Sequence, residues 1–286
     1  MIYISTSCIK KSKIADAVLE LIKNGFQNIE LSGGTKYYDG WLEELMDLKG
    51  KYNLNYLVHN YFPPPKDAFV FNLASLDNEI ASKSIQHAKK AIDTASILEA
   101  KKVGFHAGFL INIPVNQIGK KIKAQDLYNK ELSLKTFIEN YHEILLYCTK
   151  KNIKLYLENN VLSKENLKNF KTNPFFLVKS QEISFFKNHL KSFNYIFDYA
   201  HSYVSSTSLK LNESIEFDNF INQTDYLHIS DNDGYSDLNN SIKKGSPIYK
   251  HLCENPPIDK TVTLEIYEDI SQIKKTYNWL INLKQS

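Results

Sequence analysis

The chain has 286 residues, of which 35 are basic and 32 acidic, giving a formal net charge of +3, and 43% of its residues are hydrophobic. This composition is typical of a globular chain with a sizeable core and excludes a disordered one. No apolar run approaches the roughly 20 residues of a membrane helix, and the first residues lack a secretory signal, so we expect a cytoplasmic protein with no membrane partner. All 35 basic residues are lysine. The absence of arginine disfavours a nucleic-acid partner, because arginine is the preferred reader of phosphates and DNA grooves.

Short apolar, β-branched or aromatic runs alternate with longer segments of helical period along the chain. The eight expected strands are Ile2–Ser5, Asn28–Leu31, Tyr56–His59, Lys102–His106, Ile153–Glu158, Tyr195–Asp198, Tyr226–Ile229 and Val262–Ile266. The expected helices are Ile14–Lys23, Leu42–Tyr52, Asn78–Leu98, Leu134–Lys150, Ile183–Lys191, Phe217–Gln223 and Ile270–Leu283. Eight strands that alternate with helices in one chain of this length predict an α/β fold, a (β/α)8 TIM barrel in a single domain over residues 1–286. A doubly wound open sheet is the alternative, but its usual glycine-rich nucleotide turn is absent.

The connections between these elements also favour the barrel. Those from helix into strand are short, whereas those after several strands are long. The long loops are expected at Asn60–Leu76, Ala107–Gln125, Asn159–Phe176 and Ser230–Lys260. Barrels of this type keep their chemistry in the loops on the carboxyl side of the strands.

A residue that can bind a metal stands at or near the end of six expected strands. These residues are His59, His106, Glu158, Asp198, His228 and Glu265. Each of these residues alone could have a purely structural role. Six such groups are costly to bury, however, unless something pairs with them. Parallel strands in a closed barrel bring all six to one mouth. The mixture of carboxylates and imidazoles suits Zn²⁺, Mn²⁺ or Co²⁺ better than Ca²⁺. A bound divalent ion polarises a substrate oxygen, and a carboxylate beside it can act as a general base.

Two further motifs follow the sixth and seventh strands. Asp198-Tyr199-Ala200-His201 places a second imidazole three residues after a carboxylate, and we expect His201 on the turn at the same mouth. The segment from His228 to Asn239 is rich in oxygen ligands, including Asp231 and Asp233. Its Asn-Asp-Gly run is also a turn signal, so both interpretations stay open.

These residues resemble the xylose isomerase-like TIM barrels, the superfamily that joins sugar and sugar-phosphate isomerases and epimerases with endonuclease IV. The resemblance runs from about Leu54 to Tyr267. It rests on Phe71–Ser75, Phe105–Gly108, Asp198-x-x-His201, His228 and Thr263–Glu265. It implies a metal site made by Glu158, Asp198, His228 and Glu265, for which Zn²⁺ and Mn²⁺ are favoured over Co²⁺ and Mg²⁺.

The resemblance implies different roles in its two branches. In the epimerase branch Glu158 and Glu265 are the catalytic pair: one removes a proton from the substrate carbon, the other returns one from the opposite face, and the metal stabilises the enediolate. His201 then holds a substrate oxygen. In the endonuclease branch His59 and His106 join Glu158 around a second zinc ion, and His201 with an Asp-x-His pair binds a third.

Two observations favour the sugar branch. The Asp-Asn-Asp-Gly run after His228, followed by Asp237, is similar to the sugar isomerases, and Ser5-Thr6-Ser7 and Leu157-Glu158-Asn159 stand where the nuclease has Gly-His-x-Ser and Leu-Glu-Thr-Thr. The sugar branch usually continues Asp-x-His and then Gly-x-Gly, where this chain has Asp237-Leu238-Asn239 and Gly245-Ser246-Pro247, and these departures keep an idle barrel open. Asparagine is a poor zinc ligand, and we assign Asp237 and Asn239, with His201, to substrate binding. The sequence therefore predicts a divalent-metal-dependent sugar or sugar-phosphate isomerase or epimerase with a small-molecule sugar as its partner. A zinc-dependent apurinic-site endonuclease or phosphoesterase and a catalytically idle barrel are the alternatives, and the identity of the sugar and a homo-oligomeric state stay open.

Overall fold

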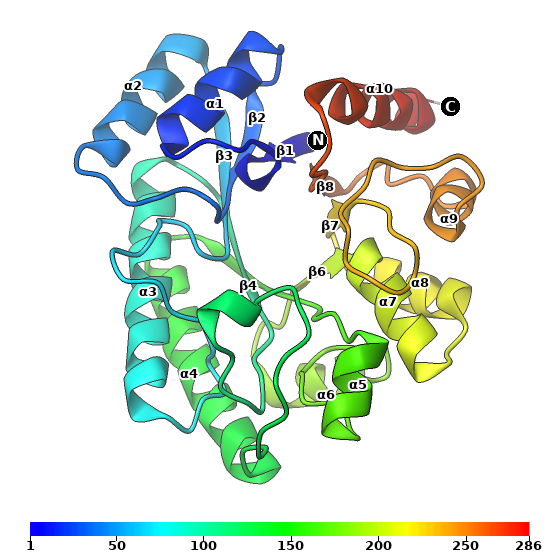
Figure 1. Ribbon diagram of the computed structural model, residues 1–286. Helices are drawn as coiled ribbons and strands as arrows, with labels where there is room; N and C mark the ends of the chain where they lie inside the picture. The colour runs from blue at the N-terminus through cyan, green and yellow to red at the C-terminus, as the bar shows by residue number, and fades with distance from the viewer. Residues whose placement is uncertain (286) are drawn as a thin grey trace.

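Eight parallel strands close into a barrel inside a ring of helices in the computed structural model, which describes residues 1–285 (Figure 1). Ser286, the last residue of the expected domain, lies outside the described residues. The strands are β1 (Ile2–Ser5), β2 (Asn28–Leu31), β3 (Asn55–His59), β4 (Lys102–His106), β5 (Lys154–Glu158), β6 (Tyr195–Asp198), β7 (Tyr226–Ile229) and β8 (Thr261–Leu264). Each strand pairs with the next, and β1 pairs with β8 to close the barrel, with Ile2 opposite Val262. The predicted (β/α)8 fold is confirmed.

Helices follow every strand of the barrel. They are α1 (Ile14–Lys23), α2 (Trp41–Tyr52), α3 (Asn78–Ile97), α4 (Lys130–Lys150), α5 (Lys164–Phe170), α6 (Glu182–His189), α7 (Tyr199–Leu209), α8 (Glu213–Ile221), α9 (Pro247–Glu254) and α10 (Ile270–Gln285), with 3₁₀ turns at Thr6–Cys8 and Val115–Gln117. Helix α7 was not expected from the sequence, and the expected loops Asn159–Phe176 and Ser230–Lys260 contain α5 and α9. Among residues 1–285, no helix combines the length and apolar character needed to cross a membrane.

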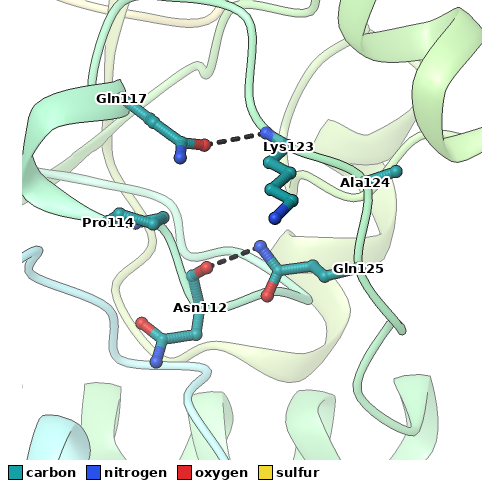
Figure 2. Close-up of a pocket in the computed structure, with 6 residues that line it drawn as sticks. All are labelled: Asn112, Pro114, Gln117, Lys123, Ala124 and Gln125. Carbon is teal, nitrogen blue, oxygen red and sulfur yellow. Dashed lines mark hydrogen bonds between the residues drawn. The ribbon is translucent and has the colours of Figure 1, made fainter.

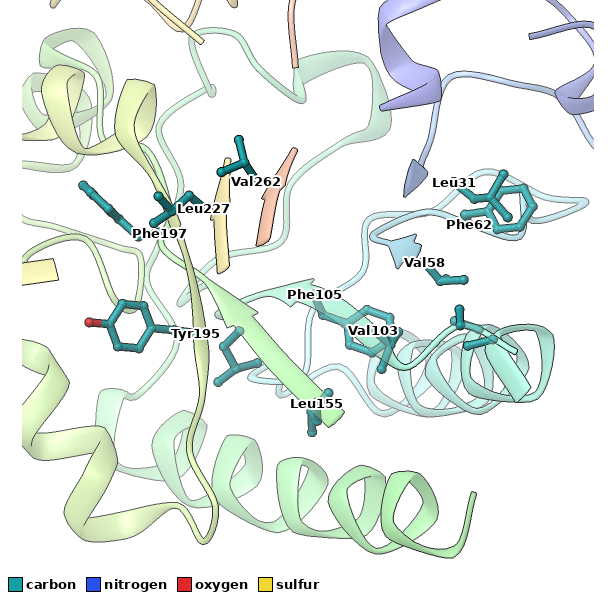
Figure 3. Close-up of a cluster of buried hydrophobic side chains, with 14 of the residues drawn as sticks. Leu31, Val58, Phe62, Val103, Phe105, Leu155, Tyr195, Phe197, Leu227 and Val262 are labelled. Carbon is teal, nitrogen blue, oxygen red and sulfur yellow. The ribbon is translucent and has the colours of Figure 1, made fainter. Parts of the chain in front are cut away.

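Alternate residues of each strand face opposite sides of the barrel wall, because side chains on a strand repeat with a period of two. The outward set, which includes Leu155, Phe197 and Leu227, is buried under the helices in the main core (Figure 3). The inward set forms a separate apolar cluster. Its members are Tyr3, Leu57, Tyr156, Ile196 and Tyr226.

The same period places a polar side chain above the inward cluster. His59, Glu158, Asp198 and His228 each stand two residues after one of its members, on the same face of the strand. Because the strands are parallel, these four side chains meet at the carboxyl end of the barrel. Glu265 follows directly after β8, two residues beyond Thr263.

Gly104 on β4 leaves room for this arrangement. A Cβ atom at this position would lie 2.4 Å from Ile196 Cδ1 and 3.0 Å from His59 Cδ2. Any larger residue would therefore displace either Ile196 of the inward cluster or the imidazole of His59.

Candidate active site

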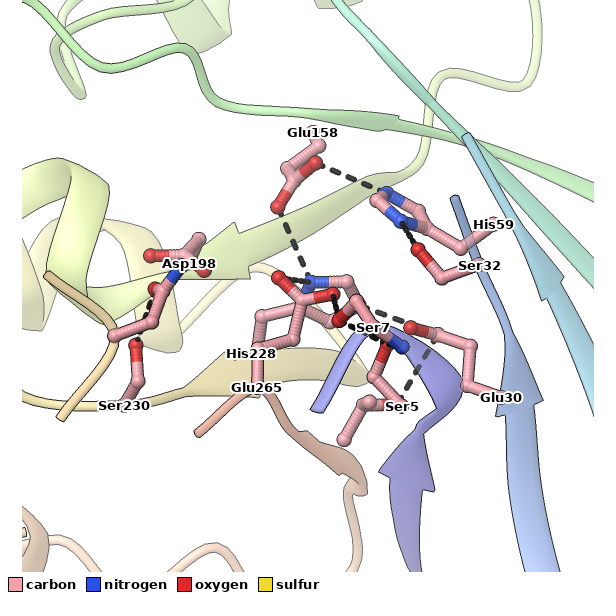
Figure 4. A network of polar contacts seen from close by, with 12 residues as sticks. Ser5, Ser7, Glu30, Ser32, His59, Glu158, Asp198, His228, Ser230 and Glu265 are labelled. Atoms are coloured by element: carbon pink, nitrogen blue, oxygen red, sulfur yellow. Dashed lines mark hydrogen bonds and ion pairs between the residues drawn. The ribbon is translucent and has the colours of Figure 1, made fainter. Parts of the chain in front are cut away.

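Side chains from four consecutive strands gather at the carboxyl end of the barrel (Figure 4). One ligand atom from each of Glu158, Asp198, His228 and Glu265 lies within 4.8 Å of the other three, and all four residues are buried. The structure thus brings together the four residues that the resemblance implied as metal ligands, and their role as ligands stays a prediction. We refer to these four residues as the ligand cluster.

Two further predicted residues, His59 and His106, lie on the other side of Glu158. His59 Nε2 is 3.0 Å and His106 Nδ1 is 3.3 Å from Glu158 Oε2, whereas Ser32 Oγ is 3.5 Å from the second ring nitrogen of His59. Burial lowers the pKa of His106 to about 4. Burial also opposes the charged form of His59, but the adjacent Glu158 raises the pKa of its ring above the ordinary value.

Asp198 has a structural task besides its place in the cluster. Its Oδ1 accepts a hydrogen bond of 2.7 Å from the backbone N–H of His201 and so caps the N-terminus of α7. Asn159, the residue after β5, holds the backbone of Asp198: its side chain accepts from the Asp198 N–H at 2.7 Å and donates to the Asp198 carbonyl at 3.1 Å. His201, expected on a turn, therefore lies in the first helical turn, with Nδ1 2.8 Å from the Asn159 carbonyl and Nε2 3.4 Å from Asp237 Oδ2.

The polar segment after β7 divides into a part near the site and a part that shapes its own loop. Asn239 is buried, and its Oδ1 accepts a hydrogen bond from Ser230 Oγ at 2.9 Å. Asp231 accepts at 2.9 Å from the backbone N–H of Lys243, and Asp233 accepts from the N–H groups two and three residues further on. The carboxylate of Asp233 thus stabilises a turn, as the Asn-Asp-Gly signal indicates, and that of Asp231 holds the far end of the same loop.

Glu30, a fully buried residue of β2, is a neighbour of the site that was not expected from the sequence. Its Oε2 lies 3.2 Å from His228 Nε2 and accepts hydrogen bonds from Tyr226 Oη and from Thr263 Oγ1. Ser7, also missed, donates to Glu265 Oε1 at 3.4 Å. A signal for Glu30 was present in the sequence: a carboxylate between two aliphatic residues of a strand, Ile29 and Leu31, is costly to bury unless it has a partner.

The two glutamates of the ligand cluster are ionised in this environment. Burial opposes the charge on Glu158, but His106, His59 and His228 together hold its pKa well below the ordinary value. Burial acts in the same direction on Glu265, yet the neighbouring His228 lowers the pKa of this carboxyl to about 2. Both side chains are therefore carboxylates at neutral pH and can accept a proton.

The pKa values of His228, His201 and Asp198 are shifted in the opposite direction, upward. Burial disfavours the charged ring of His228, but Glu30 and the two cluster glutamates raise its pKa well above the ordinary value. Burial likewise opposes the charged form of His201, whose pKa Asp198 and Asp237 raise. Burial raises the pKa of Asp198 to about 7, although His201 favours its ionised form.

Several polar atoms of the cluster lack hydrogen-bond partners in the described part of the chain. Glu158 Oε1, Asp198 Oδ2 and His228 Nδ1 are such atoms, and all three are buried, although Glu158 Oε1 and His228 Nδ1 form an ion pair of 3.1 Å with each other. Among residues 1–285, no ion pair joins a lysine to any carboxylate of the ligand cluster. Buried carboxylate oxygens that accept no hydrogen bond are costly, and three carboxylates with an imidazole are a suitable donor set for a divalent cation such as Zn²⁺ or Mn²⁺. The residues present therefore fit such an ion.

A surface hollow of about 510 Å³ lies elsewhere, in the loop between β4 and α4 (Figure 2). Gln117 Oε1 accepts from the Lys123 N–H at 2.7 Å, and Gln125 Nε2 donates to the Asn112 carbonyl at 2.7 Å. These polar side chains of the hollow therefore form hydrogen bonds with the backbone of their own loop. The described residues that line it include no carboxylate or imidazole. The ligand cluster is therefore the stronger candidate for chemistry.

The fold and the site define a (β/α)8 barrel with a buried carboxylate–imidazole cluster suited to a metal at the carboxyl ends of its strands. The sequence matches the xylose isomerase-like TIM barrel family over residues 18–283, and the chain belongs to this family. At the level of sequence, no curated protein matches it.

Solved structures show the same fold over nearly the whole chain. A D-tagatose 3-epimerase-like protein is 18% identical, covers 99% of this chain and 97% of its own, and has a TM-score of 0.73. A protein from Thermus thermophilus, in a crystal soaked with ZnCl2, is 18% identical with the same coverages and a TM-score of 0.64. D-psicose 3-epimerase from Clostridium cellulolyticum, solved with D-tagatose, is 12% identical, covers 99% and 98%, and has a TM-score of 0.65.

Proposed function

We propose that this chain is a divalent-metal-dependent isomerase or epimerase of a sugar or sugar phosphate. The observation that carries the proposal is the position of two carboxylates beside one ring nitrogen. Glu158 Oε1 lies 3.1 Å and Glu265 Oε2 lies 3.7 Å from His228 Nδ1. Two proton-transfer groups thus border the place where a shared cation would sit. The names of similar structures, sugar 3-epimerases among them, support a sugar substrate.

The ligand cluster would hold the cation, whose positive charge would stabilise negative charge that develops on the substrate oxygens. One of Glu158 and Glu265 takes the proton from the carbon beside the substrate carbonyl, and the C–H electron pair moves toward that carbonyl. The other glutamate takes a proton from solvent water and delivers it to the opposite face of the same carbon as the electron pair moves back from the carbonyl oxygen, and the first glutamate then gives its proton to solvent. His201, whose raised pKa keeps its ring protonated, donates to a substrate oxygen from Nε2, the nitrogen that faces Asp237.

Exchange of a carbon-bound proton with solvent tests this proposal. The wild-type protein, loaded with Zn²⁺ or Mn²⁺, is incubated in D2O with the ketohexoses D-tagatose and D-psicose, and deuterium at the sugar carbons is followed by NMR. We expect incorporation with the wild type and its loss in Glu158→Gln and in Glu265→Gln. Glu216→Gln is the matched control, because Glu216 is an equally buried glutamate that accepts hydrogen bonds from Ser180, away from the cluster. Unchanged exchange in either cluster variant contradicts the two-glutamate mechanism.

One observation favours a second candidate, a zinc-dependent apurinic-site endonuclease or phosphoesterase. His59 and His106 both approach Glu158 Oε2, at 3.0 and 3.3 Å, and could hold a second ion with it. Against this candidate, the chain has no arginine, and Asn239 bonds to Ser230 instead of offering an imidazole beside Asp237. Three zinc ions per chain, together with cleavage of abasic DNA, would favour the nuclease. A protein that binds no metal under any condition would favour an idle barrel.

A further inference from the structure

Glu30 is a carboxylate in the middle of the barrel wall. It lies on β2 between two fully buried aliphatic residues, Ile29 and Leu31, and is itself fully buried. Among the described residues, its one ion pair is with His228, whose Nε2 lies 3.2 Å from Glu30 Oε2. Burying a carboxylate costs free energy of folding unless a partner compensates its charge.

Three neighbouring groups fix the position of this carboxylate. Tyr226 Oη and Thr263 Oγ1, the latter at 3.1 Å, donate hydrogen bonds to the same oxygen that faces His228. Tyr226 and His228 are two residues apart on β7 and therefore share the inner face of the barrel. Glu30 thus joins β2 to β7 and β8 directly beneath the ligand cluster.

The two ring nitrogens of His228 face different partners. Nε2 faces Glu30, whereas Nδ1 lies 3.1 Å from Glu158 Oε1 and 3.7 Å from Glu265 Oε2. Cation binding requires the neutral form of this ring, and a neutral imidazole carries one N–H and one lone pair. Because an ionised carboxylate can only accept, the hydrogen bond to Glu30 requires the proton on Nε2 and leaves the lone pair on Nδ1, where the cluster lies.

We propose that Glu30 is a positioning residue for His228: it holds the Nε2–H and so directs Nδ1 toward the cation position of the ligand cluster. This inference rests on the cation site of the proposed function and does not depend on the identity of the sugar. Carboxylates that orient a metal-binding histidine in this way typically change metal affinity by about 10–100-fold when they are removed.

Zinc affinity without any substrate is the first test. The wild type, Glu30→Gln and the matched control Glu216→Gln are stripped of metal, and Zn²⁺ binding is measured by competition with a chromophoric chelator. We expect Glu30→Gln to bind Zn²⁺ about 10–100-fold more weakly than the wild type and Glu216→Gln to bind it equally well. Wild-type zinc affinity in a folded Glu30→Gln overturns the inference.

The hydrogen bond itself is the second readout. In metal-free protein labelled with ¹⁵N-histidine, we expect a downfield Nε2 proton of His228 that is protected from solvent exchange, and we expect Glu30→Gln to lose it. A merely structural glutamate elsewhere in the core would not affect this resonance, so Glu216→Gln should keep it. Persistence of the protected resonance in Glu30→Gln also overturns the inference.

Thr263→Val is the milder variant if Glu30→Gln fails to fold. It removes one hydrogen bond to Glu30 and leaves the carboxylate in place, so we expect a weaker, few-fold loss of zinc affinity and a shifted His228 proton resonance. No change in either quantity would overturn the inference. A wild type that binds zinc but exchanges no sugar proton contradicts the proposed function alone, whereas a wild type that binds no divalent ion contradicts both.

Discussion

At the amino end of the barrel, one carboxylate is surrounded by cationic and hydroxyl donors. Asp225, just before β7, lies 3.0 Å from Lys154 Nζ and 3.5 Å from Lys102 Nζ, and Tyr156 Oη donates to it at 2.8 Å. At the carboxyl end, by contrast, three buried carboxylates belong to the ligand cluster, and their ion pairs within residues 1–285 are with imidazoles alone.

This contrast distinguishes a carboxylate that the protein's own lysines neutralise from a group of buried carboxylates that fits a bound cation. The chain's own lysines neutralise Asp225, so this end needs nothing from outside the protein. Glu158 Oε1 and Asp198 Oδ2 instead remain buried with no hydrogen-bond partner among the described residues. A fold that leaves acceptors unpaired in its interior gains stability once a cation binds there, and the following experiments test this difference.

The largest expected effect is on turnover. Glu158→Gln removes a proposed proton-transfer group and a proposed cation ligand, and we expect solvent-proton exchange on the sugar to fall by about 10²–10⁴-fold or more. Asp225→Asn, the same chemical change at the opposite end, should leave the exchange rate within about two-fold of the wild type. NMR of the sugar in D2O measures both. Equal losses in the two variants would remove the functional distinction between the ends.

The second effect is metal-dependent stability. Zinc at about 100 times its Kd should raise the free energy of unfolding of the wild type by about 2.7 kcal/mol. Asp198→Asn should lose most of this gain, because an amide is a poor zinc ligand, while asparagine still serves as the N-cap of α7. Urea unfolding with zinc and with EDTA measures the difference. Asp225→Asn should retain the full gain, and a full gain in Asp198→Asn would argue against its place in the metal site.

The third effect belongs to the amino end alone. Asp225→Asn removes the charge that Lys102 and Lys154 neutralise, and we expect it to lower the free energy of unfolding by about 1 kcal/mol, since the pair is partly exposed. This loss should be the same with zinc and with EDTA, as measured by urea unfolding. A zinc-dependent loss would mean that the two ends are coupled.

The smallest effect is a pH dependence at the same end. Burial opposes ionisation of Asp225, but Tyr156, Lys102 and Lys154 hold its pKa below the ordinary value. The folded state therefore releases this proton more readily than the unfolded state, so the stabilisation is complete above the unfolded pKa of about 3.9 and is lost as the pH falls through the folded pKa. In EDTA, the stability difference between the wild type and Asp225→Asn should shrink by less than about 1 kcal/mol below pH 4. A difference that grows on acidification would reverse this sign.

The strands were predictable because their signal is local. Apolar β-branched and aromatic runs, each with a polar residue at or near its carboxyl end, located all eight strands, and β1, β2, β4, β6 and β7 have the expected bounds. Parallel strands in a barrel must present those ends at one mouth, so a gathering of Glu158, Asp198, His228 and Glu265 followed from the fold class. Their metal-binding roles stay a prediction.

The missed helices have different physical causes. In α7, serines and β-branched residues have weak helix propensity, and buried residues occupy most positions instead of one stripe, so the helix depends on its surroundings and on the Asp198 cap. In α9, Ser246 caps the helix and Pro247 is its first residue, which is an ordinary signal for the start of a helix. It was missed because Gly245-Ser246-Pro247 was considered only as a departure from Gly-x-Gly.

By itself, the sequence determined the order of strands and the chemical groups at their carboxyl ends, because a two-residue period and short apolar runs act over a few residues. Only the tertiary structure decided which of those groups meet. Glu30 faces His228 across 198 residues of chain, and the Asn239 amide oxygen accepts a hydrogen bond from Ser230. Such pairings depend on barrel closure and loop conformation, which are set by packing between distant segments, and a local pattern does not contain them.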